Sequence, residues 1–110
     1  PPMEKQFGYK IDNNLVTFVF RKPLNLEEKI EKVSVAGEFN DWNPASKAFE
    51  FAKVTEDTYQ LTVKSEVLGK PGEKKMFKFV VNGNTWIEPS KKALNVIKND
   101  NYFNLYIELK

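Results

Sequence analysis

Apolar and polar residues alternate along most of this chain, and the alternation predicts short β-strands. Successive side chains of a strand point to opposite faces, so a run with every second residue apolar buries one face. No long run has the period of an amphipathic helix, although residues 24–29 are expected to form a short helical turn. The predicted strands cover residues 15–21, 30–37, 48–53, 58–64, 76–81, 85–88 and 102–109.

The apolar positions of these strands are predicted to face inward and form one core. The strands are separated by clusters of Asn, Asp, Gly and Pro, which favour turns. Asn82 and Gly83 form the strongest hairpin signal, because both residues tolerate a positive φ. The predicted core residues are Val16, Phe18, Phe20, Val33, Val35, Phe49, Phe51, Tyr59, Leu61, Val63, Phe77, Phe79, Val81, Phe103, Leu105, Ile107 and Leu109.

About seven short strands at this spacing predict an all-β protein, an immunoglobulin-like antiparallel β-sandwich. The length of 110 residues predicts a single domain, residues 1–110, with residues 1–13 as a loosely ordered lead-in. Because the chain begins with Pro1 and Pro2 rather than with methionine, we expect a processed or excised module.

Charge and composition exclude several classes of function. Lys and Arg number 17 and Asp and Glu number 15, so the net charge of +2 favours neither nucleic acid nor an anionic membrane as a partner. No apolar run approaches the roughly 20 residues of a membrane span, so no membrane insertion is predicted. The chain has no cysteine and no histidine, which excludes disulfides and removes the commonest general base and metal ligand.

The remaining acidic residues do not predict catalysis or metal binding. Glycoside hydrolysis needs two carboxyl groups about 5 to 9.5 Å apart across a cleft, whereas the acids here are scattered over turns and outward strand positions. No segment has the ligand spacing of a calcium loop, and no glycine-rich phosphate loop is present. We therefore predict a protein that is not an enzyme and that has no cofactor and no metal site.

Two tryptophans in turn-like segments are the strongest sign of a binding function. Trp42 follows an Asn-Asp turn, and Trp86 follows the Asn82-Gly83 turn. An exposed indole stacks on the C–H face of a sugar ring, and nearby polar side chains bond the hydroxyl groups. Asn43, Asn84 and the outward-facing Lys78 are the polar candidates. The alternative is that both tryptophans are partly buried caps on the sandwich and that Lys78 is only solvated.

Two segments resemble the signatures of the family 48 carbohydrate-binding modules. Residues 33–42, VSVAGEFNDW, resemble the pattern V-x-V-x-G-x-F-N-x-W, and residues 77–86, FKFVVNGNTW, resemble Y-K-F-x-V-D-G-x-W. The family includes the glycogen-binding domain of the AMP-activated protein kinase β subunit and N-terminal modules of glucan branching and debranching enzymes. The resemblance covers residues 15–109 and implies a sandwich of the early-set immunoglobulin-like type.

The resemblance also implies site residues. In the kinase-type modules two tryptophans stack on glucose and a lysine and an asparagine bond its hydroxyls, and Trp42, Trp86, Lys78 and Asn104 stand at the matching positions. Asn104 has the outward parity of its strand and is expected to face solvent. The chain departs from the pattern at Asn82, where the family has Asp, at Leu105, where it has Asn, and at Thr85, which is an extra residue before Trp86.

We therefore expect a non-catalytic module that binds α-glucans such as glycogen, starch or maltooligosaccharides. The predicted carbohydrate-binding residues are Trp42, Trp86, Lys78, Asn104, Asn84 and Asn43. A catalytic domain or another protein is the expected partner of such a module. The alternative is an immunoglobulin-like structural or protein-interaction module, whose apolar patch would comprise outward Met76, Val80, Tyr102 and Tyr106.

Overall fold

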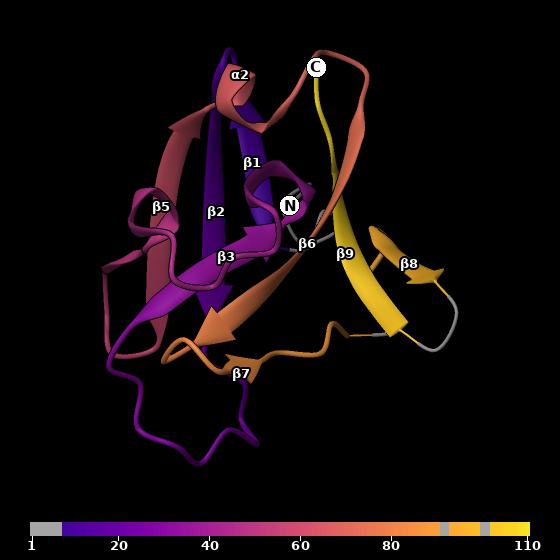
Figure 1. Cartoon of the computed structure of the whole chain (residues 1–110). Coiled ribbons are helices and arrows are strands. Elements are labelled where there is room, and N and C mark those ends of the chain that lie inside the picture. Colours follow the sequence, from indigo (N-terminus) through magenta and orange to yellow (C-terminus); the bar gives the residue numbers. More distant parts are fainter. Residues whose placement is uncertain (1–7, 91–92, 100–101) are drawn as a thin grey trace.

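The computed structural model describes residues 8–90, 93–99 and 102–110, and two antiparallel sheets form a sandwich (Figure 1). The first sheet has the strand order β1-β2-β5-β4, and the second has the order β3-β6-β9-β8, with β7 also paired to β6. Sheet A comprises β1 (Tyr9–Asp12), β2 (Leu15–Arg21), β4 (Ala52–Lys53) and β5 (Thr58–Lys64). Sheet B comprises β3 (Val33–Gly37), β6 (Lys74–Val81), β7 (Thr85–Trp86), β8 (Val96–Asn99) and β9 (Tyr102–Glu108).

Aromatic side chains fill the space between the two sheets. Phe18 of sheet A lies 5.2 Å from Phe77 of sheet B between ring centroids, in an edge-to-face arrangement. Phe20 and Phe79 form a second contact between the sheets at 5.4 Å. Such pairs contribute about 0.5–1.5 kcal/mol beyond the area that they bury. The predicted core is confirmed, except that Leu61, Val63 and Phe103 are only partly buried.

The sandwich fold is confirmed, and the bounds of β2 and β5 are those that the sequence predicts. Two strands were not predicted, β1 and β8, because four residues give too little alternation to be recognised. Tyr9 of β1 is buried in the core, so residues 9–12 belong to sheet A and are not a loose lead-in. Residues 1–7 of the predicted lead-in lie outside the described residues.

Two other local predictions need correction. Residues 48–53 do not form one strand, because the 3-10 turn η2 (Lys47–Phe49) precedes the two-residue strand β4. Residues 24–29 form no helix beyond a single turn, which the Leu26 N–H closes by donating to the Pro23 carbonyl at 3.1 Å, and residues 29–32 are held by hydrogen bonds to the side chain of Asn82. Two further short elements are η1 (Glu38–Asn40) and the single helical turn α2 (Ser65–Leu68).

One edge of β6 is shared by two strands that separate from each other. β9 pairs with the first half of β6, where Leu105 stands opposite Phe77. β7 pairs with the last two residues of β6, where Trp86 stands opposite Val80, and the N–H of Ile87 extends this ladder by donating to the carbonyl of Phe79. Lys78 therefore lies where β7 and β9 diverge.

Candidate functional site

Three of the predicted binding residues, Trp86, Lys78 and Asn104, lie on the face of sheet B that points away from the core, which we call the outer face. Strand register places Ala36 beside Lys78 and Ser34 beside Val80. Trp86 stands beside Val80 on its other side. Cross-strand neighbours point to the same face of a sheet. The register therefore brings β3, β6 and β7 together on one surface.

The extra residue Thr85 does not turn Trp86 away from this face. Thr85 pairs with the inward-facing Val81, and its hydroxyl donates a 2.7 Å hydrogen bond to Oε1 of Glu28. The next side chain, Trp86, must then point to the opposite side. Its indole is 39% exposed and available to a ligand.

Trp42 lies on a segment that is hydrogen-bonded to β3, the strand that pairs with β6 on the side opposite β7 and β9. Its backbone has a φ of 58°, in the left-handed region, and its N–H donates to the carbonyl of Gly37 at 2.9 Å. Two residues later, the carbonyl of Pro44 accepts a 2.8 Å hydrogen bond from the outward hydroxyl of Ser34. These bonds hold residues 42–44 along β3, and the Trp42 side chain is half-buried.

The residues before Trp42 have structural roles in this turn. The Asn40 side chain accepts a hydrogen bond from the Gly37 N–H at 2.9 Å and donates one to the Val35 carbonyl at 3.0 Å. The Phe39 ring stacks on Phe49 with centroids 5.3 Å apart. The motif that resembles a carbohydrate-binding signature is thus mostly a scaffold that positions Trp42.

The same segment covers the free edge of β3. The carbonyls of Val33, Val35 and Gly37 point away from β6, and each accepts a hydrogen bond from the chain that follows. The donors are the Phe51 N–H at 2.8 Å, the Asn40 side chain and the Trp42 N–H. An isolated bridge between Ser34 and Glu50 adds to this cover.

Lys78 has the predicted outward parity, but it is not solvated. Only 7% of the residue is exposed, and Nζ donates a 2.9 Å hydrogen bond to Oε1 of Glu88. The same nitrogen lies 6.0 Å from the centroid of the Tyr102 ring, within cation–π range. Glu88 continues the β7 ladder and so stands opposite Lys78, a partner that the sequence analysis did not identify.

The prediction that Asn104 faces solvent is wrong. Asn104 is 8% exposed, and its amide nitrogen lies 3.7 Å from Sδ of Met76. β9 lies between β6 and β8, with Ile97 opposite Asn104, so neighbouring side chains cover this outward position. The alternation of side chains along a strand predicts the face on which a residue lies, but it does not predict which neighbouring groups cover that residue.

Asn43 and Asn84 are exposed and make only local hydrogen bonds through Oδ1. Asn43 accepts a bond from the Ala45 N–H at 2.9 Å, and Asn84 is a second, more distant acceptor for the Thr85 hydroxyl, at 3.3 Å against 2.7 Å for Glu28. Asn43 lies in the Trp42 segment, and Asn84 lies in the turn before Trp86. Each exposed amide is therefore adjacent to a tryptophan in sequence.

The apolar patch predicted for a protein partner is only partly exposed. Val80 is fully buried, and Met76 and Tyr106 are half-buried. Val80 cannot belong to an exposed patch because none of its surface is accessible to solvent. The exposed large apolar side chains on the outer face are Trp86, Ile97 and Tyr102.

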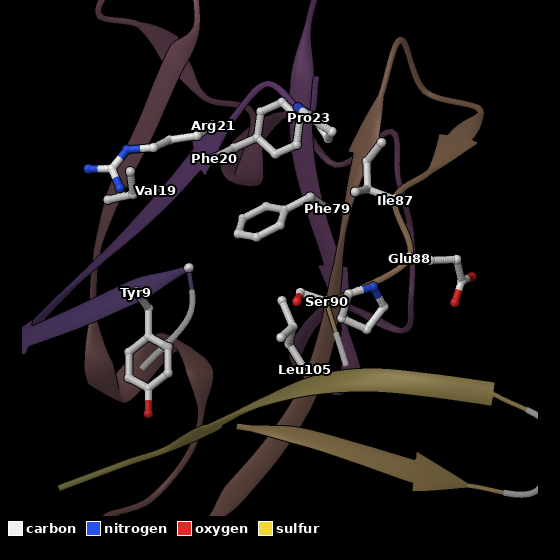
Figure 2. Close-up of a pocket in the computed structure, with 12 residues that line it drawn as sticks. Tyr9, Val19, Phe20, Arg21, Pro23, Phe79, Ile87, Glu88, Ser90 and Leu105 are labelled. Atoms are coloured by element: carbon white, nitrogen blue, oxygen red, sulfur yellow. The ribbon is translucent and has the colours of Figure 1, made fainter. Parts of the chain in front are cut away.

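A separate pocket of about 370 Å³ opens between the two sheets beside β7 (Figure 2). Phe20, Phe79, Leu105 and Ile87 surround it, and the side chains of its charged residues, Arg21 and Glu88, point away from its centre. A specific ligand site normally has polar groups that converge on the ligand. Because the charged groups do not converge here, the outer face is the stronger candidate site. The pocket depends on the spacing of two sheets, so no local sequence signal predicts it.

Two titratable groups have shifted pKa values. Burial raises the pKa of Tyr9, whose hydroxyl accepts a hydrogen bond from the Glu108 N–H at 3.4 Å. The Lys70 N–H lowers the pKa of the exposed Glu73 carboxyl by donating to it at 2.6 Å. Both groups make structural contacts and lie outside the predicted binding residues.

Among the described residues, no three acidic side chains gather in a way that would hold a metal ion. In the same part of the chain, no helix has the length and apolar character needed to span a bilayer. In comparisons with known proteins, no family model and no curated protein sequence matches this chain.

Proposed function

We propose that this protein is a non-catalytic module that binds α-glucans on the outer face of sheet B. The observation that supports this best is the placement of an exposed indole, Trp86, on the same face as the charged pair Lys78 and Glu88. A glucose unit needs a flat apolar surface for its C–H face and hydrogen-bonding groups for its rim. The outer face offers both within neighbouring register positions.

The remaining predicted residues lie on segments that adjoin or belong to sheet B. Trp42 and Asn43 approach from the side of β3, Asn84 lies in the turn before Trp86, and Asn104 lies on β9. The resemblance to family 48 modules implies Trp42, Trp86, Lys78 and Asn104 as site residues and supports the same function. One or two stacked rings and a few hydrogen bonds of about 1 kcal/mol each predict an affinity in the micromolar to millimolar range.

Such a module would raise the local concentration of glucan for an attached or associated catalytic domain. The test is isothermal titration calorimetry with maltoheptaose, with cellohexaose as the β-linked control. We expect heat and a change in tryptophan fluorescence with maltoheptaose only. The variant Trp86→Ala should lose binding, whereas Leu24→Ala, which removes an exposed apolar side chain elsewhere, should not. No heat and no fluorescence change at millimolar maltoheptaose would refute the proposal.

A protein-interaction module is the second candidate function. It is favoured by the exposure of three large apolar side chains on one face, namely Trp86, Ile97 and Tyr102. Glucan binding that is lost in Trp86→Ala but kept in Ile97→Ala would favour the first function. Absence of glucan binding, together with capture of an attached catalytic domain that Ile97→Ala weakens, would favour the second.

A further inference from the structure

Two exposed side chains of the outer face, Glu88 and Tyr102, lie beside one buried ammonium group. The Lys78 side chain is enclosed, and its Nζ contacts the Glu88 carboxylate at 2.9 Å and lies 6.0 Å from the Tyr102 ring centroid. Glu88 and Tyr102 themselves are open to solvent, with exposed fractions of 67% for the Glu88 side chain and 66% for Tyr102. A ligand approaching this face therefore meets Glu88 and Tyr102 before it meets Lys78.

Glu88 has the geometry of a fixed hydrogen-bond acceptor. One carboxylate oxygen is held by Lys78, and the other has no hydrogen-bond donor among the residues that the structure describes. Glu88 lies two residues after Trp86 in an extended segment, so its carboxylate and the indole lie on the same face. A carboxylate held by a buried cation loses little conformational freedom when it accepts a hydrogen bond from a hydroxyl group.

Tyr102 supplies a second exposed ring beside the same ammonium. It lies on β9, whereas Trp86 lies on β7, and these two strands diverge from each other beside Lys78. Two exposed rings near one carboxylate suit a pyranose chain, because the rings can stack on its C–H faces while the carboxylate accepts hydrogen bonds from its hydroxyl groups.

We infer that Glu88 and Tyr102 contact the glucan directly, and that Lys78 is a positioning residue that holds both of them in place. This assignment rests on the proposed function, and it reverses the role that the family resemblance implies for Lys78. The two assignments make opposite predictions. If Glu88 is a contact, its removal weakens binding. If Lys78 is the contact, removal of Glu88 frees the ammonium and leaves the affinity unchanged or raises it.

The test is calorimetric titration of the full chain with maltoheptaose. Glu88→Ala should weaken binding about tenfold, because hydrogen bonds to a charged acceptor are lost. Tyr102→Ala should weaken it about fivefold to tenfold, while Tyr102→Phe keeps the ring and most of the affinity. Glu56→Ala is the matched control, since Glu56 forms an exposed ion pair with Lys53 at 3.3 Å and lies in the turn between β4 and β5 of the other sheet.

The role of Lys78 is tested with Lys78→Met and with the double variant Lys78→Met/Glu88→Ala. If Lys78 acts through its partners, the double variant binds no more weakly than Lys78→Met alone. Additive losses would instead indicate a direct contact by Lys78. Thermal unfolding of each variant separates these effects from misfolding, and the exposed Glu88 variant keeps the test decisive if Lys78→Met does not fold.

These experiments distinguish failure of the proposed function from failure of this inference. No heat with the unmodified protein overturns the proposed function, and this inference with it. Binding by the unmodified protein that is lost in Trp86→Ala but unchanged or stronger in Glu88→Ala overturns this inference alone.

Discussion

The side-chain amide of Asn40 donates a hydrogen bond to the carbonyl of Val35 at 3.0 Å and accepts one from the Gly37 N–H. Replacing Asn40 with Ala leaves both partly buried backbone groups unpaired. We expect the free energy of unfolding to fall by about 2–3 kcal/mol. Urea unfolding measures the loss. Asn43→Ala, which removes only a local bond at an exposed turn, should cost less than about 1 kcal/mol.

Gly37 has no room for a side chain. A Cβ at this position would lie 2.5 Å from the Met76 carbonyl oxygen and 2.8 Å from the Phe39 ring. Its φ of −165° is ordinary extended backbone, so the cost of Gly37→Ala is steric. We expect a loss of about 2–4 kcal/mol in unfolding free energy. Gly72→Ala is the contrast, because it has open space but a φ of 88°, and it should cost only about 1 kcal/mol. Equal losses in both variants would contradict the steric explanation.

Asn82 uses all four hydrogen-bonding positions of its amide. Its oxygen accepts from the N–H groups of Glu31 and Lys32, and its nitrogen donates to Oε2 of Glu28 and to the Lys29 carbonyl. Asp at this position cannot donate and would place a second carboxylate against Glu28.

We therefore expect Asn82→Asp to lose about 2–3 kcal/mol at neutral pH, measured by chemical unfolding. Asn84→Asp makes the same change at an exposed position of the same turn and should have little effect. A loss of similar size in both variants would show that charge in the turn, and not the amide network, is responsible.

The raised pKa of Tyr9 predicts a loss of stability in base. Below about pH 10 the phenol is protonated in both states, and its contribution to stability is complete. Above that pH the unfolded chain ionises first, so the free energy of unfolding falls as the pH rises through the folded-state pKa. The difference in stability between the unmodified protein and Tyr9→Phe should therefore change above about pH 10 and stay constant below it. A constant difference over the whole range would contradict the shift.

The two tryptophans differ in exposure, which fluorescence can measure. Trp42→Phe leaves only Trp86, which is exposed, so its emission should be red-shifted and readily quenched by acrylamide. Trp86→Phe leaves the half-buried Trp42, with emission at shorter wavelength and weaker quenching. The opposite order would contradict the placement of the rings.

Strand alternation predicted most of the fold because burial on one face requires a period of two. It placed Val16, Phe18 and Phe20 correctly in the core. It could not predict that Lys78 and Asn104 are covered, because the covering groups come from other strands. The partner of Asn82, Glu28, is 54 residues away, and no local pattern indicates such a contact.

The sequence likewise predicted only part of the candidate site. The sequence identified Trp86, and strand pairing places it on the same face as Lys78. Glu88 and Tyr102 were not recognised as site residues, because only the register of β7 and β9 against β6 brings them to the same ammonium. The pairing of Glu88 with Lys78 had a weak signal in sequence, namely two opposite charges that lie four residues before and four residues after the turn of residues 82–84.

The hydrogen bonds along the outer edge of β3 have a consequence for self-association. An open strand edge is a template on which a second molecule can extend a sheet, and this is a common start of aggregation. Here the outward carbonyls of Val33, Val35 and Gly37 are already occupied by the same polypeptide. The turn that carries Trp42 therefore protects the β3 edge of sheet B from pairing with a second molecule. Loss of Asn40 would expose part of that edge, so we expect reduced solubility to accompany the loss of stability.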